Sequence, residues 1–453
     1  MSADELISAL LSLSASERVS ILDSCGVGHL GSHLLIAGIE PVEVIEISNE
    51  DTDQTMKILD QKLTGDRAAI FTLSYDLGRK MLNIGNRESV TESIEPDAYV
   101  ACFDVLVIHD YDTGITELAG NSAKFGSITT KLLSAISNRR FEISDRRVEV
   151  ISNFTRPQYL AAIEVIREHI RDGETYQTNL TQQLTAKMPN DLTPEIVFAR
   201  LRRDHPAPFS SFIKRRSSTV ISASPERFFK VGREGGRSTS FAHADRKQIS
   251  TSPIKGTRPR GKTDAEDQLL KADLLTSQKD RAENTMIVDL LRNDLGRVCE
   301  YGSVKVEKLC ELEEHPTLFH LVSTVNGELK SDVRPSEILT ALFPCGSITG
   351  APKISTMRII DEVESIPRGL SMGAIGYYMP DGFGDKDSPL SSLDSRLDLS
   401  VAIRTMVVRG QTATFNVGGG IVIDSDPESE YEESLTKARA ILDAIGGYLE
   451  HEP

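Results

Sequence analysis

The chain has 453 residues, of which 39% are hydrophobic and 26% are charged, and its formal net charge is −16. These values are typical of a globular protein with about two to four domains or one large α/β assembly, and the negative charge argues against nucleic acid or an anionic membrane as the main partner. The five cysteines show no CxxC spacing, so we expect a reducing compartment, the cytoplasm, and no disulfide framework. The first residues lack the basic segment of a signal peptide, and no apolar run approaches the ~20 residues of a membrane helix.

Hydrophobic patterning is weakest before residue 150. There it predicts helices at Leu6–Leu13 and Asp53–Leu63, a turn at Tyr75–Gly78, and strands at Ala68–Ser74, Ala98–His109 and Val148–Ser152. Further along the chain, helices are predicted at Pro157–Ile170, Pro194–Arg203, Ala351–Glu362 and Asp424–Leu449, together with a long helical stretch that breaks near Ser277 and ends at Gly296.

The second part of the chain also carries the clearer strand signals. Strands are predicted at Tyr176–Leu184, Phe209–Ile213, Thr219–Ser222, Phe228–Val231, Ser303–Leu309, Phe319–Leu329, Gly373–Tyr378, Leu399–Val408 and Thr412–Val417. Two polar stretches, Gly232–Ser252 and Asp381–Arg396, are predicted as exposed insertions. Because helices and strands do not strictly alternate, the predicted fold class is α+β with antiparallel sheets.

The stretch Pro253–Arg258, PIKGTR, contains the amine whose surroundings most resemble a reaction site. Proline restricts the backbone before Lys255, glycine lets a ligand approach after it, and Thr257 adds a hydroxyl donor. A lysine acts as a nucleophile only when its ammonium loses a proton, which desolvation in a pocket favours. Taken alone, the pattern also fits an ordinary basic loop, because more basic residues follow directly.

Two predicted helices carry acids at i, i+3 spacing. Asp280 and Glu283 share a face of one helix, and Glu430 and Glu433 share a face of the other, with Lys437 one turn later. If the two faces meet, they offer the carboxylate oxygens that Mg²⁺ prefers and leave positions for water and an anionic substrate. Each acidic run also fits the start of a helix, where acids cap the free N–H groups and complement the dipole.

Four other features are candidates for the active site. Gly346–Lys353 opens a helix with glycines whose N–H groups can bind an anion, although it lacks the GK[ST] ending of a P-loop. Gly418–Gly420 follows a strand and either contacts a ligand or forms a bulge or tight bend. Arg404 lies in an otherwise apolar strand and needs a substrate carboxylate or a structural acid as its partner. His320 lies in an apolar stretch, where a lone histidine is more often a satisfied core residue.

Glu226 follows a proline at a strand junction, in the sequence SPER. If burial raises its pKa, such a carboxyl acts as a general acid. The alternative is a salt bridge to Arg227 or to another neighbour.

In this order the stretches resemble the chorismate-utilising enzymes. The matching motifs cover more than half of the chain, from about Tyr176 to Ala440, and read YQTNLTQQL, SPERFF, PIKGTRPRG, KDRAENTMIVDLLRNDLGR, HLVSTV, GSITGAPK, GAIGYY, AIRT and GGGIVIDSDPESEYEESLTKA. The resemblance implies a large α+β fold of two layered antiparallel sheets with the active site between them. It also implies an N-terminal region, 1–150, like that of anthranilate synthase component I, packed closely on a chorismate-binding catalytic region, 151–453.

The resemblance implies a role for each candidate residue. Glu283 and Glu433 match the Mg²⁺-binding glutamates, and Asp280 and Glu430 match acids that assist through water. Glu226 matches the acid that protonates the departing 4-hydroxyl. The residues that match substrate-binding positions are Thr257, His320, Ser347, Arg404, Gly418, Gly419, Gly420 and Lys437.

Two positions separate the branches of this family. Isochorismate and salicylate synthases have a lysine base where this chain has Gln177, and an amide cannot be that base. Anthranilate synthases have alanine in place of Lys255, whereas PIKGT and Ala207–Phe212 resemble the aminodeoxychorismate synthase branch. Ser371 departs from the tyrosine that many members have at its position.

The resemblance therefore implies amination of chorismate for p-aminobenzoate and folate synthesis, with Mg²⁺ as cofactor. Lys255 would form a covalent adduct at C2 while the 4-hydroxyl leaves, and ammonia would then add at C4 and expel the lysine. The chain shows no GxCxG-type glutaminase motif, so we expect a separate glutamine amidotransferase partner. The alternatives are an anthranilate synthase component I and a catalytically silent regulatory subunit.

Overall fold

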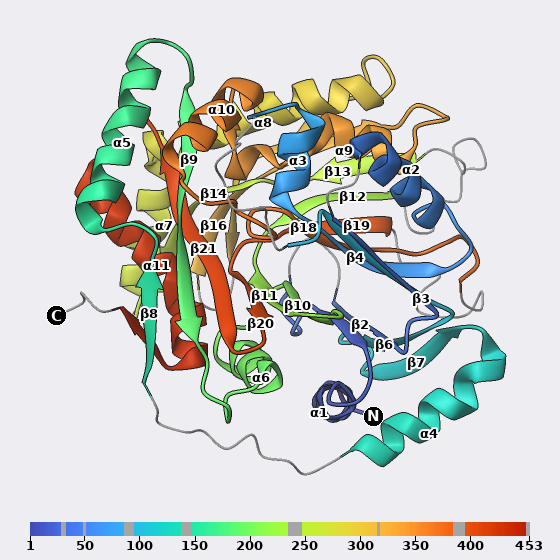
Figure 1. Cartoon of the computed structure of the whole chain (residues 1–453). Helices are drawn as coiled ribbons and strands as arrows, with labels where there is room; N and C mark the ends of the chain where they lie inside the picture. Colours follow the sequence, from blue (N-terminus) through green and yellow to red (C-terminus); the bar gives the residue numbers. More distant parts are fainter. Residues whose placement is uncertain are drawn as a thin grey trace.

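The computed structural model describes residues 1–28, 33–48, 51–85, 95–136, 147–233, 247–314, 318–383 and 395–449. Within these ranges two large β-sheets lie against each other, with helices on their outer faces (Figure 1). Nearly all neighbouring strands run antiparallel, so the predicted α+β fold class is confirmed. No helix in the described part of the chain is long and apolar enough to cross a membrane.

The first sheet has 12 strands and joins the N-terminal and C-terminal parts of the chain. Its strands, in the order in which they lie, are β22 (Gly447–Leu449), β8 (Val148–Ser152), β9 (Gln177–Lys187), β21 (Thr412–Ile421), β20 (Thr405–Arg409), β11 (Thr219–Ser224), β10 (Phe209–Lys214), β1 (Val19–Asp23), β2 (Leu34–Ile39), β6 (Val105–Asp110) and β7 (Ile115–Gly120), with β17 (Gly350–Ala351) paired to β9.

The second sheet has 10 strands. Their order is β14 (Ile254–Pro259), β16 (Leu318–Glu328), β13 (Lys247–Thr251), β12 (Arg227–Arg233), β19 (Ser395–Val401), β18 (Ala374–Tyr378), β4 (Ala68–Leu73), β5 (Ala98–Phe103) and β3 (Glu43–Ile47), with β15 (Lys305–Glu314) paired to β16. Both sheets contain strands from before and after residue 150, and the domain boundary predicted there stays a prediction.

The helices connect and cover the strands. They are α1 (Ala3–Leu13), α2 (Thr52–Lys62), α3 (Tyr75–Met81), α4 (Phe125–Ala135), α5 (Arg156–Arg171), α6 (Pro194–Asp204), α7 (Asp264–Thr276), α8 (Gln278–Val298), α9 (Pro335–Leu342), α10 (Lys353–Val363) and α11 (Pro427–Ile445), with 3-10 turns η1 (Ser122–Lys124) and η2 (Gly346–Ile348).

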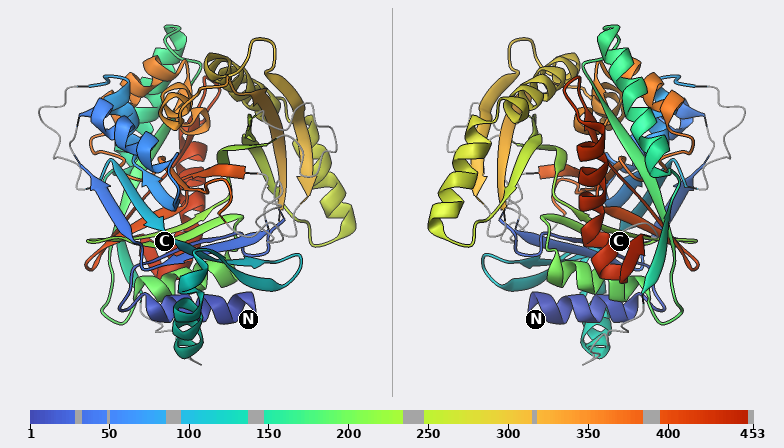
Figure 2. Two further views of the ribbon diagram at one scale, coloured as in Figure 1. Left: turned by 90° about the vertical axis from the view of Figure 1, so that its right-hand side faces the viewer. Right: turned by 90° about the vertical axis from the view of Figure 1, so that its left-hand side faces the viewer.

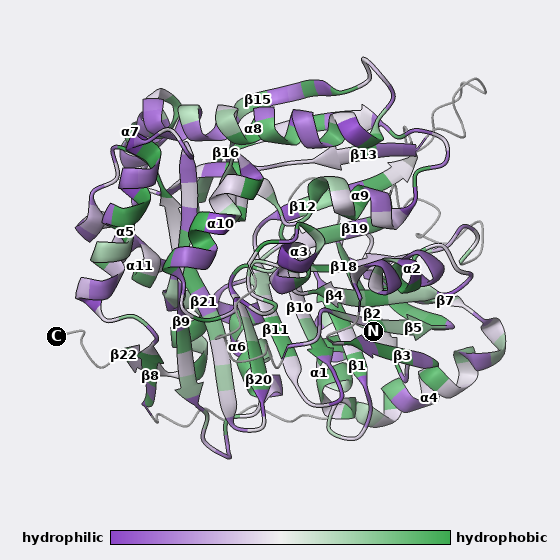
Figure 3. Ribbon diagram, turned by 45° about the horizontal axis from the view of Figure 1, so that its top comes forward, coloured by the Kyte–Doolittle hydropathy of each residue, from purple (hydrophilic) through white to green (hydrophobic). Residues whose placement is uncertain are grey.

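Three apolar layers explain why the elements stack in this way. The first lies between the 12-stranded sheet and α1, α4, α6 and α11. The second lies between the two sheets, where Ile36 and Val220 of one sheet meet Ile70 and Tyr99 of the other. The third lies between the 10-stranded sheet and α2, α8 and α9. Figure 3 shows the same division, with hydrophobic strands inside and hydrophilic residues along the exposed helix faces.

The helices that border the functional site start and stop at recognisable residues. Ser277 separates α7 from α8 and caps α8, since its hydroxyl accepts a hydrogen bond from the Asp280 N–H at 3.2 Å. Asp426 caps α11 in the same way, and Gly446 ends that helix with a positive φ of 67°. The lobe formed by α7, α8 and β16 stands beside α11 in both views of Figure 2. Because α7 ends at Thr276 and α8 begins at Gln278, the helix break predicted near Ser277 is confirmed.

Two predicted strands are wrong because the chain changes sheets within them. Leu399–Val408 divides into β19 of the second sheet and β20 of the first, and the break includes Arg404 at φ 47°. Ala98–His109 divides into β5 and β6 in the same way. An apolar run buried in both sheets shows no change of hydropathy at the point where it crosses between them.

Three predictions for turns or loops also need correction. Tyr75–Gly78 begins the helix α3, because the Ser74 hydroxyl caps it by accepting from the Asp76 N–H. Within the insertion predicted at Gly232–Ser252, residues 247–251 form β13, and 234–246 lie outside the described residues. Of the insertion predicted at Asp381–Arg396, residues 384–394 lie outside them, and the last two residues begin β19.

Candidate active site

The candidate site lies where the chain twice crosses between the sheets. Glu226 lies in the crossing from β11 to β12, and Arg404 lies in the return crossing from β19 to β20. The two crossings are hydrogen-bonded at both ends: the Val401 N–H donates to the Glu226 carbonyl at 3.0 Å, and the Ala223 N–H donates to the Arg404 carbonyl at 3.0 Å. The backbone therefore fixes both residues next to each other at the boundary of the two layers.

Glu226 is a buried acid that is not paired with its neighbouring arginine. Its residue is 6% exposed, and burial raises its pKa to about 7, although a hydrogen bond with Ser347 and the charge of Lys255 oppose the shift. Its Oε1 has no hydrogen-bond partner within the described residues. Arg227 pairs instead with Asp398, so the salt-bridge alternative is wrong. A carboxyl with a pKa of about 7 is still protonated in a large share of the molecules at neutral pH, which suits a general acid.

Lys255 lies on a strand, not in a basic loop. The strand β14 pairs with β16, and Gly256 has φ 84°, with Asp280 so close that an added Cβ would lie 2.9 Å from its side chain. The Lys255 side chain is 15% exposed, and its Nζ lies 3.8 Å from Glu283 Oε2. Its charge also acts on the Glu226 carboxyl, which accepts a hydrogen bond from the backbone of the preceding Ile254, so the candidate nucleophile and the candidate acid are near neighbours.

Thr257 and His320 lie opposite each other on β14 and β16. The Thr257 hydroxyl and His320 Nδ1 are 2.8 Å apart, so one ring nitrogen is satisfied, as expected for a histidine in a buried strand. Ser347 lies in η2, where it is 7% exposed and contacts both the Cys345 thiol, at 3.3 Å, and the Glu226 carboxyl. Cys345 was not among the predicted site residues, and nothing in its sequence context marks it.

The acids of α8 and α11 face each other across lysines. Lys279 of α8 reaches Glu430 of α11, with 3.4 Å between Nζ and Oε1, and Lys437 lies 2.9 Å from Glu433. Burial raises the pKa of Glu283 despite the nearby Lys255 and Lys279. The Glu433 side chain is 54% exposed, and although partial desolvation opposes its ionisation, Lys437 and the other lysines lower its pKa. Lys279 was not among the predicted site residues, although its i, i+4 spacing to Glu283 could have indicated that it lies beside the acids.

These acids were predicted to hold Mg²⁺. Among the described residues no group of three or more His, Cys, Asp and Glu side chains is arranged to enclose a metal ion. Carboxylate oxygens are nevertheless the donors that Mg²⁺ prefers, and Mg²⁺ often takes only one or two of them beside water and substrate. Desolvation is the main cause of the raised pKa of the partly buried Glu283, and the negative charges of Asp280 and Glu430 add to it, which a divalent cation beside these carboxylates would offset. The residues present therefore fit Mg²⁺, while the assignment stays a prediction.

The three glycines of β21 continue the strand, so the predicted alternative of a bend is wrong. Gly418 and Gly420 allow a close approach to β9, because an added Cβ would lie 1.9 Å from the Leu180 carbonyl or 1.8 Å from Gln177 Nε2, respectively. An added Cβ on Gly419 would instead lie 3.3 Å from Glu430 Oε2 and 3.5 Å from Lys437 Nζ. The Gly419 face therefore adjoins the acid and lysine cluster.

Arg404 has no carboxylate partner among the described residues, and burial lowers its pKa. The structural ion pair considered for this arginine is therefore not found there. Its carbonyl accepts a hydrogen bond from the Ala223 N–H beside the other crossing, and among the described residues no ion pair joins its side chain to the acids. A partly buried guanidinium without an acid is suited to bind an anionic ligand.

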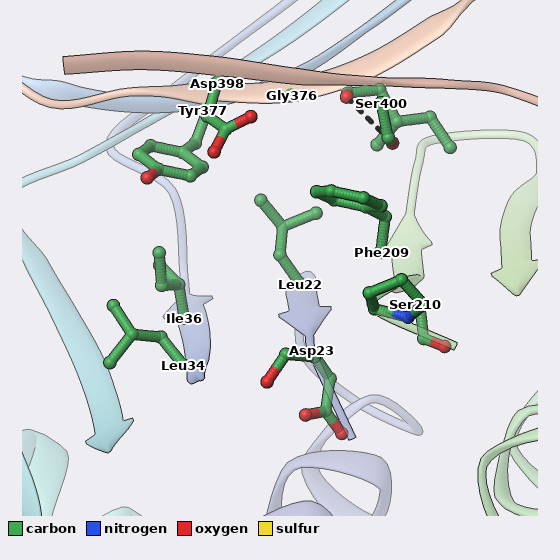
Figure 4. Close-up of a pocket in the computed structure, with 13 residues that line it drawn as sticks. Leu22, Asp23, Leu34, Ile36, Phe209, Ser210, Gly376, Tyr377, Asp398 and Ser400 are labelled. Carbon is green, nitrogen blue, oxygen red and sulfur yellow. Dashed lines mark hydrogen bonds between the residues drawn. The ribbon is translucent and has the colours of Figure 1, made fainter. Parts of the chain in front are cut away.

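A separate pocket lies between the two sheets (Figure 4). It has an empty volume of about 480 Å³ and is lined by Leu22, Asp23, Ser24, Leu34, Ile36, Pro208, Phe209, Ser210, Ile375, Gly376, Tyr377, Asp398 and Ser400. Figure 4 shows Leu22, Phe209 and Tyr377 pointing into the space between the layers. None of the site residues described above lines this pocket, and we therefore treat it as distinct from the reaction site.

The comparisons with known proteins agree with this geometry. The model of the chorismate binding enzyme family matches residues 21–443. The chain belongs to this family. It is 43% identical to an aminodeoxychorismate synthase of Streptomyces pristinaespiralis over 64% of this chain and 36% of that protein. It is 40% identical to an anthranilate synthase component 1 of Haloarcula marismortui over 83% of this chain and 75% of that protein.

A solved structure extends the likeness to the whole fold. The anthranilate synthase component I of Streptococcus pneumoniae superimposes with a TM-score of 0.73 and 26% identity, covering 92% of this chain and 93% of that one. The chain spans about a third of the length of the Streptomyces aminodeoxychorismate synthase. Aminodeoxychorismate synthases and anthranilate synthases match this chain at similar identity. Overall similarity therefore does not distinguish the two activities, and the distinction rests on individual residues of the site.

Proposed function

We propose that this chain is component I of an aminodeoxychorismate synthase, which converts chorismate and ammonia to 4-amino-4-deoxychorismate. The observation that carries the proposal is Lys255, a largely buried amine 3.8 Å from Glu283 that faces the same space as the protonated acid Glu226. Anthranilate synthases resembled by the other motifs have no amine at this position. A nucleophilic lysine gives the site a way to direct ammonia to C4.

The proposed chemistry proceeds in two additions. Lys255 Nζ, in its unprotonated form, bonds to C2 of chorismate while the ring double bonds shift and the C4–O bond breaks. Glu226 supplies the proton with which the hydroxyl leaves as water. The nitrogen of ammonia then bonds to C4 and the C2–Nζ bond breaks, which restores the lysine. The proton released by ammonia returns to the Glu226 carboxylate.

The chain's cationic groups suit a substrate with two carboxylates. Arg404 and Lys437 are the candidates for binding them, beside the backbone of Gly418, Gly419 and Gly420, and Thr257, His320 and Ser347 are the candidates for contacts near the ring. Glu283 and Glu433 would hold Mg²⁺, with Asp280 and Glu430 acting through water. When bound, the cation supplies positive charge that orients a substrate carboxylate. Holding the ring in one orientation lets Lys255 and Glu226 act on opposite ends of the reacting system.

The ammonia source is proposed to be a glutamine amidotransferase subunit that works together with these 453 residues, which themselves show no glutaminase motif of the GxCxG type. The product would be a precursor of p-aminobenzoate and folate. A test gives the purified chain chorismate, Mg²⁺ and either ammonium at raised pH or glutamine. We expect 4-amino-4-deoxychorismate from ammonium and no product from glutamine. Glutamine-dependent product from the single chain would contradict the separate partner.

The Haloarcula relative favours anthranilate synthase component I as a second candidate, and Lys255 variants distinguish the two. Loss of a nucleophile costs several kcal/mol of transition-state stabilisation, so Lys255→Ala should lower aminodeoxychorismate formation at least ~100-fold. Lys255→Arg should be equally poor, because a guanidinium binds carboxylate and cannot attack C2. Wild-type protein treated with chorismate should carry the adduct in an intact-protein mass spectrum. Near-normal activity of Lys255→Arg, no adduct, and anthranilate as product would establish the second candidate.

A further inference from the structure

A buried ion pair lies directly beside Glu226 and has no part in the chemistry above. Arg227 donates from Nε to Asp398 Oδ1 at 2.9 Å and from Nη2 to Oδ2 at 3.0 Å. The two residues are 2% and 6% exposed. The Arg227 guanidinium also lies over the Phe209 ring, 5.1 Å from its centroid. Because a buried bidentate pair is costly to distort, it holds the start of β12 in one place.

The strand ladder does not fix this part of β12 by itself. Arg227 pairs with Ser400, but the register with β19 shifts before Phe229. Such an irregularity bends the strand and leaves its first residue less constrained than a regular ladder does. The side-chain pair therefore supplies a restraint that the local backbone pairing lacks.

The Glu226 carboxyl has few attachments of its own. It contacts Ser347 and the backbone at Ile254, and its Oε1 has no hydrogen-bond partner within the described residues. The position of its proton therefore depends mainly on where the backbone holds the residue. Three restraints hold that backbone. The Val401 N–H donates to the Glu226 carbonyl, and the Ser224 hydroxyl donates to the Val401 carbonyl at 2.6 Å and accepts from the Glu226 N–H at 3.3 Å. The third restraint is the ion pair between Arg227, the next residue in the chain, and Asp398.

We infer that Arg227 and Asp398 form a positioning pair, which holds Glu226 at the point where it delivers its proton to the leaving hydroxyl. Neither residue touches a reacting atom, and both act through the backbone of Glu226. Asp398 and Phe209 also line the pocket between the sheets (Figure 4), so the pair joins the wall of that pocket to the acid. The inference rests on the proposed function, because it takes Glu226 as the proton donor.

Three variants test the pair without changing the groups that face the Glu226 carboxyl, which are Lys255 of β14 and, around η2, Cys345 and Ser347. Asp398→Asn keeps the shape and removes the charge, and Arg227→Lys keeps the charge and removes the bidentate contact. Ser224→Ala is a milder change that removes one of the other restraints on the same backbone.

The readouts are kcat and KM for chorismate with ammonium, and the position of the high-pH limb of the rate profile. We expect kcat of Asp398→Asn and Arg227→Lys to fall about tenfold, since small misplacements of a reacting group cost one to two orders of magnitude. Ser224→Ala should lose about threefold by the same argument. KM should stay within about twofold, and the high-pH limb should move to lower pH, because a displaced carboxyl gains solvent and its pKa falls.

The matched control is Arg202→Lys, which alters another buried arginine–aspartate contact, 2.8 Å from Asp23 on the other side of the pocket. It should lower thermal stability and leave kcat and the high-pH limb unchanged. If Asp398→Asn and Ser224→Ala lose stability but keep the wild-type limb and kcat, as the control does, the positioning role is overturned. These two variants decide the question if Arg227→Lys does not fold. Absence of amination by the wild type would refute the proposed function. The positioning role would then be tested by the ratio of variant kcat to wild-type kcat in the chorismate reaction that the chain does catalyse.

Discussion

The two spaces between the sheets differ in how their charged groups are satisfied. Around the pocket, Asp23 has the Arg202 guanidinium at 2.8 Å, and Asp398 has the Arg227 guanidinium at 2.9 Å. At the active site, Oε1 of the buried Glu226 has no hydrogen-bond partner in the described chain. Both spaces contain buried carboxyl groups, yet only the second leaves one without a cation at hydrogen-bond distance.

This difference separates ion pairs that hold the fold from the buried carboxyl that we propose acts on a substrate. An acid paired with arginine stays ionised and cannot donate a proton near neutral pH. A buried acid without such a partner keeps its proton and stores unfavourable free energy, which is a common sign of a functional site.

Glu226→Gln should have the largest effect on turnover. An amide cannot donate the acid proton, and loss of a general acid typically costs about 10²–10⁴-fold in rate. The same change should stabilise the protein at pH 8, because a pKa raised from 4.5 to about 7 penalises the ionised folded state by about 3 kcal/mol. Initial rates and urea unfolding at pH 5 and pH 8 provide the measurement.

The sign of the pH effect follows from proton binding. Between pH 4.5 and about 7 the folded state of the wild type holds the Glu226 proton and the unfolded state does not. The free energy of unfolding of the wild type therefore falls as pH rises through this window, and the variant should lack this part of the fall. Identical pH dependence of stability in both proteins would contradict the buried, protonated acid.

Glu433→Ala should raise the Mg²⁺ concentration needed for half-maximal turnover at least about tenfold, as expected for loss of a metal-binding carboxylate. The fold should survive, because the side chain is 54% exposed. The matched control is Glu432→Ala, which removes the neighbouring acid, 61% exposed and near Arg156 instead of Lys437. Equal Mg²⁺ dependence of the two variants would remove Glu433 from the metal site.

The ratio of the wild-type rate to the Glu226→Gln rate should fall by about tenfold per pH unit above about 7, because the Glu226 carboxyl must be protonated to act and its pKa is about 7, while both proteins carry the same Lys255 amine. The experiment keeps the concentration of free ammonia constant, so that only the enzyme titrates. A ratio that stays level from pH 7 to pH 9 under this condition would show that another group protonates the leaving hydroxyl.

Asp23→Asn should have the smallest effect on turnover and a large one on stability. Its side chain is fully buried against Arg202, and breaking a buried pair typically costs about 3–5 kcal/mol. Turnover per folded molecule should stay within about twofold of the wild type, since Asp23 lines the pocket and not the reaction site. The measurements are thermal unfolding and the rate at about 20 °C below the unfolding transition. A rate much lower than that of the wild type would show that the pocket contributes to turnover.

The sequence was sufficient for the fold class and for most helices that border the site. The break at Ser277 and the start of α11 were predictable because capping is local chemistry. The strand β14 was not, since a stretch with proline, glycine and basic residues becomes a strand only through its pairing with β16, about 60 residues away.

The pairing of charged groups was the least predictable part. Arg227 was weighed as a partner of the adjacent Glu226, but it binds Asp398, which lies 171 residues along the chain. The position of Arg404 in a crossing between sheets depends on a single residue with positive φ inside an apolar run. Both outcomes are set by the meeting of distant strands, which local patterns do not encode.

The two hydrogen-bonded crossings at Glu226 and Arg404 also determine where the chain tolerates changes of length. One residue added to either crossing would shift the following strand by one position and turn its side chains to the opposite face of the sheet. The turn between β6 and β7 joins two neighbouring strands of one sheet, and an added Cβ on Gly114 would meet nothing within 4 Å, so a longer turn has room there although Gly114 itself has a φ of 69°. A library of single-residue insertions selected for folding should therefore accept changes at Gly114 and reject them at both crossings.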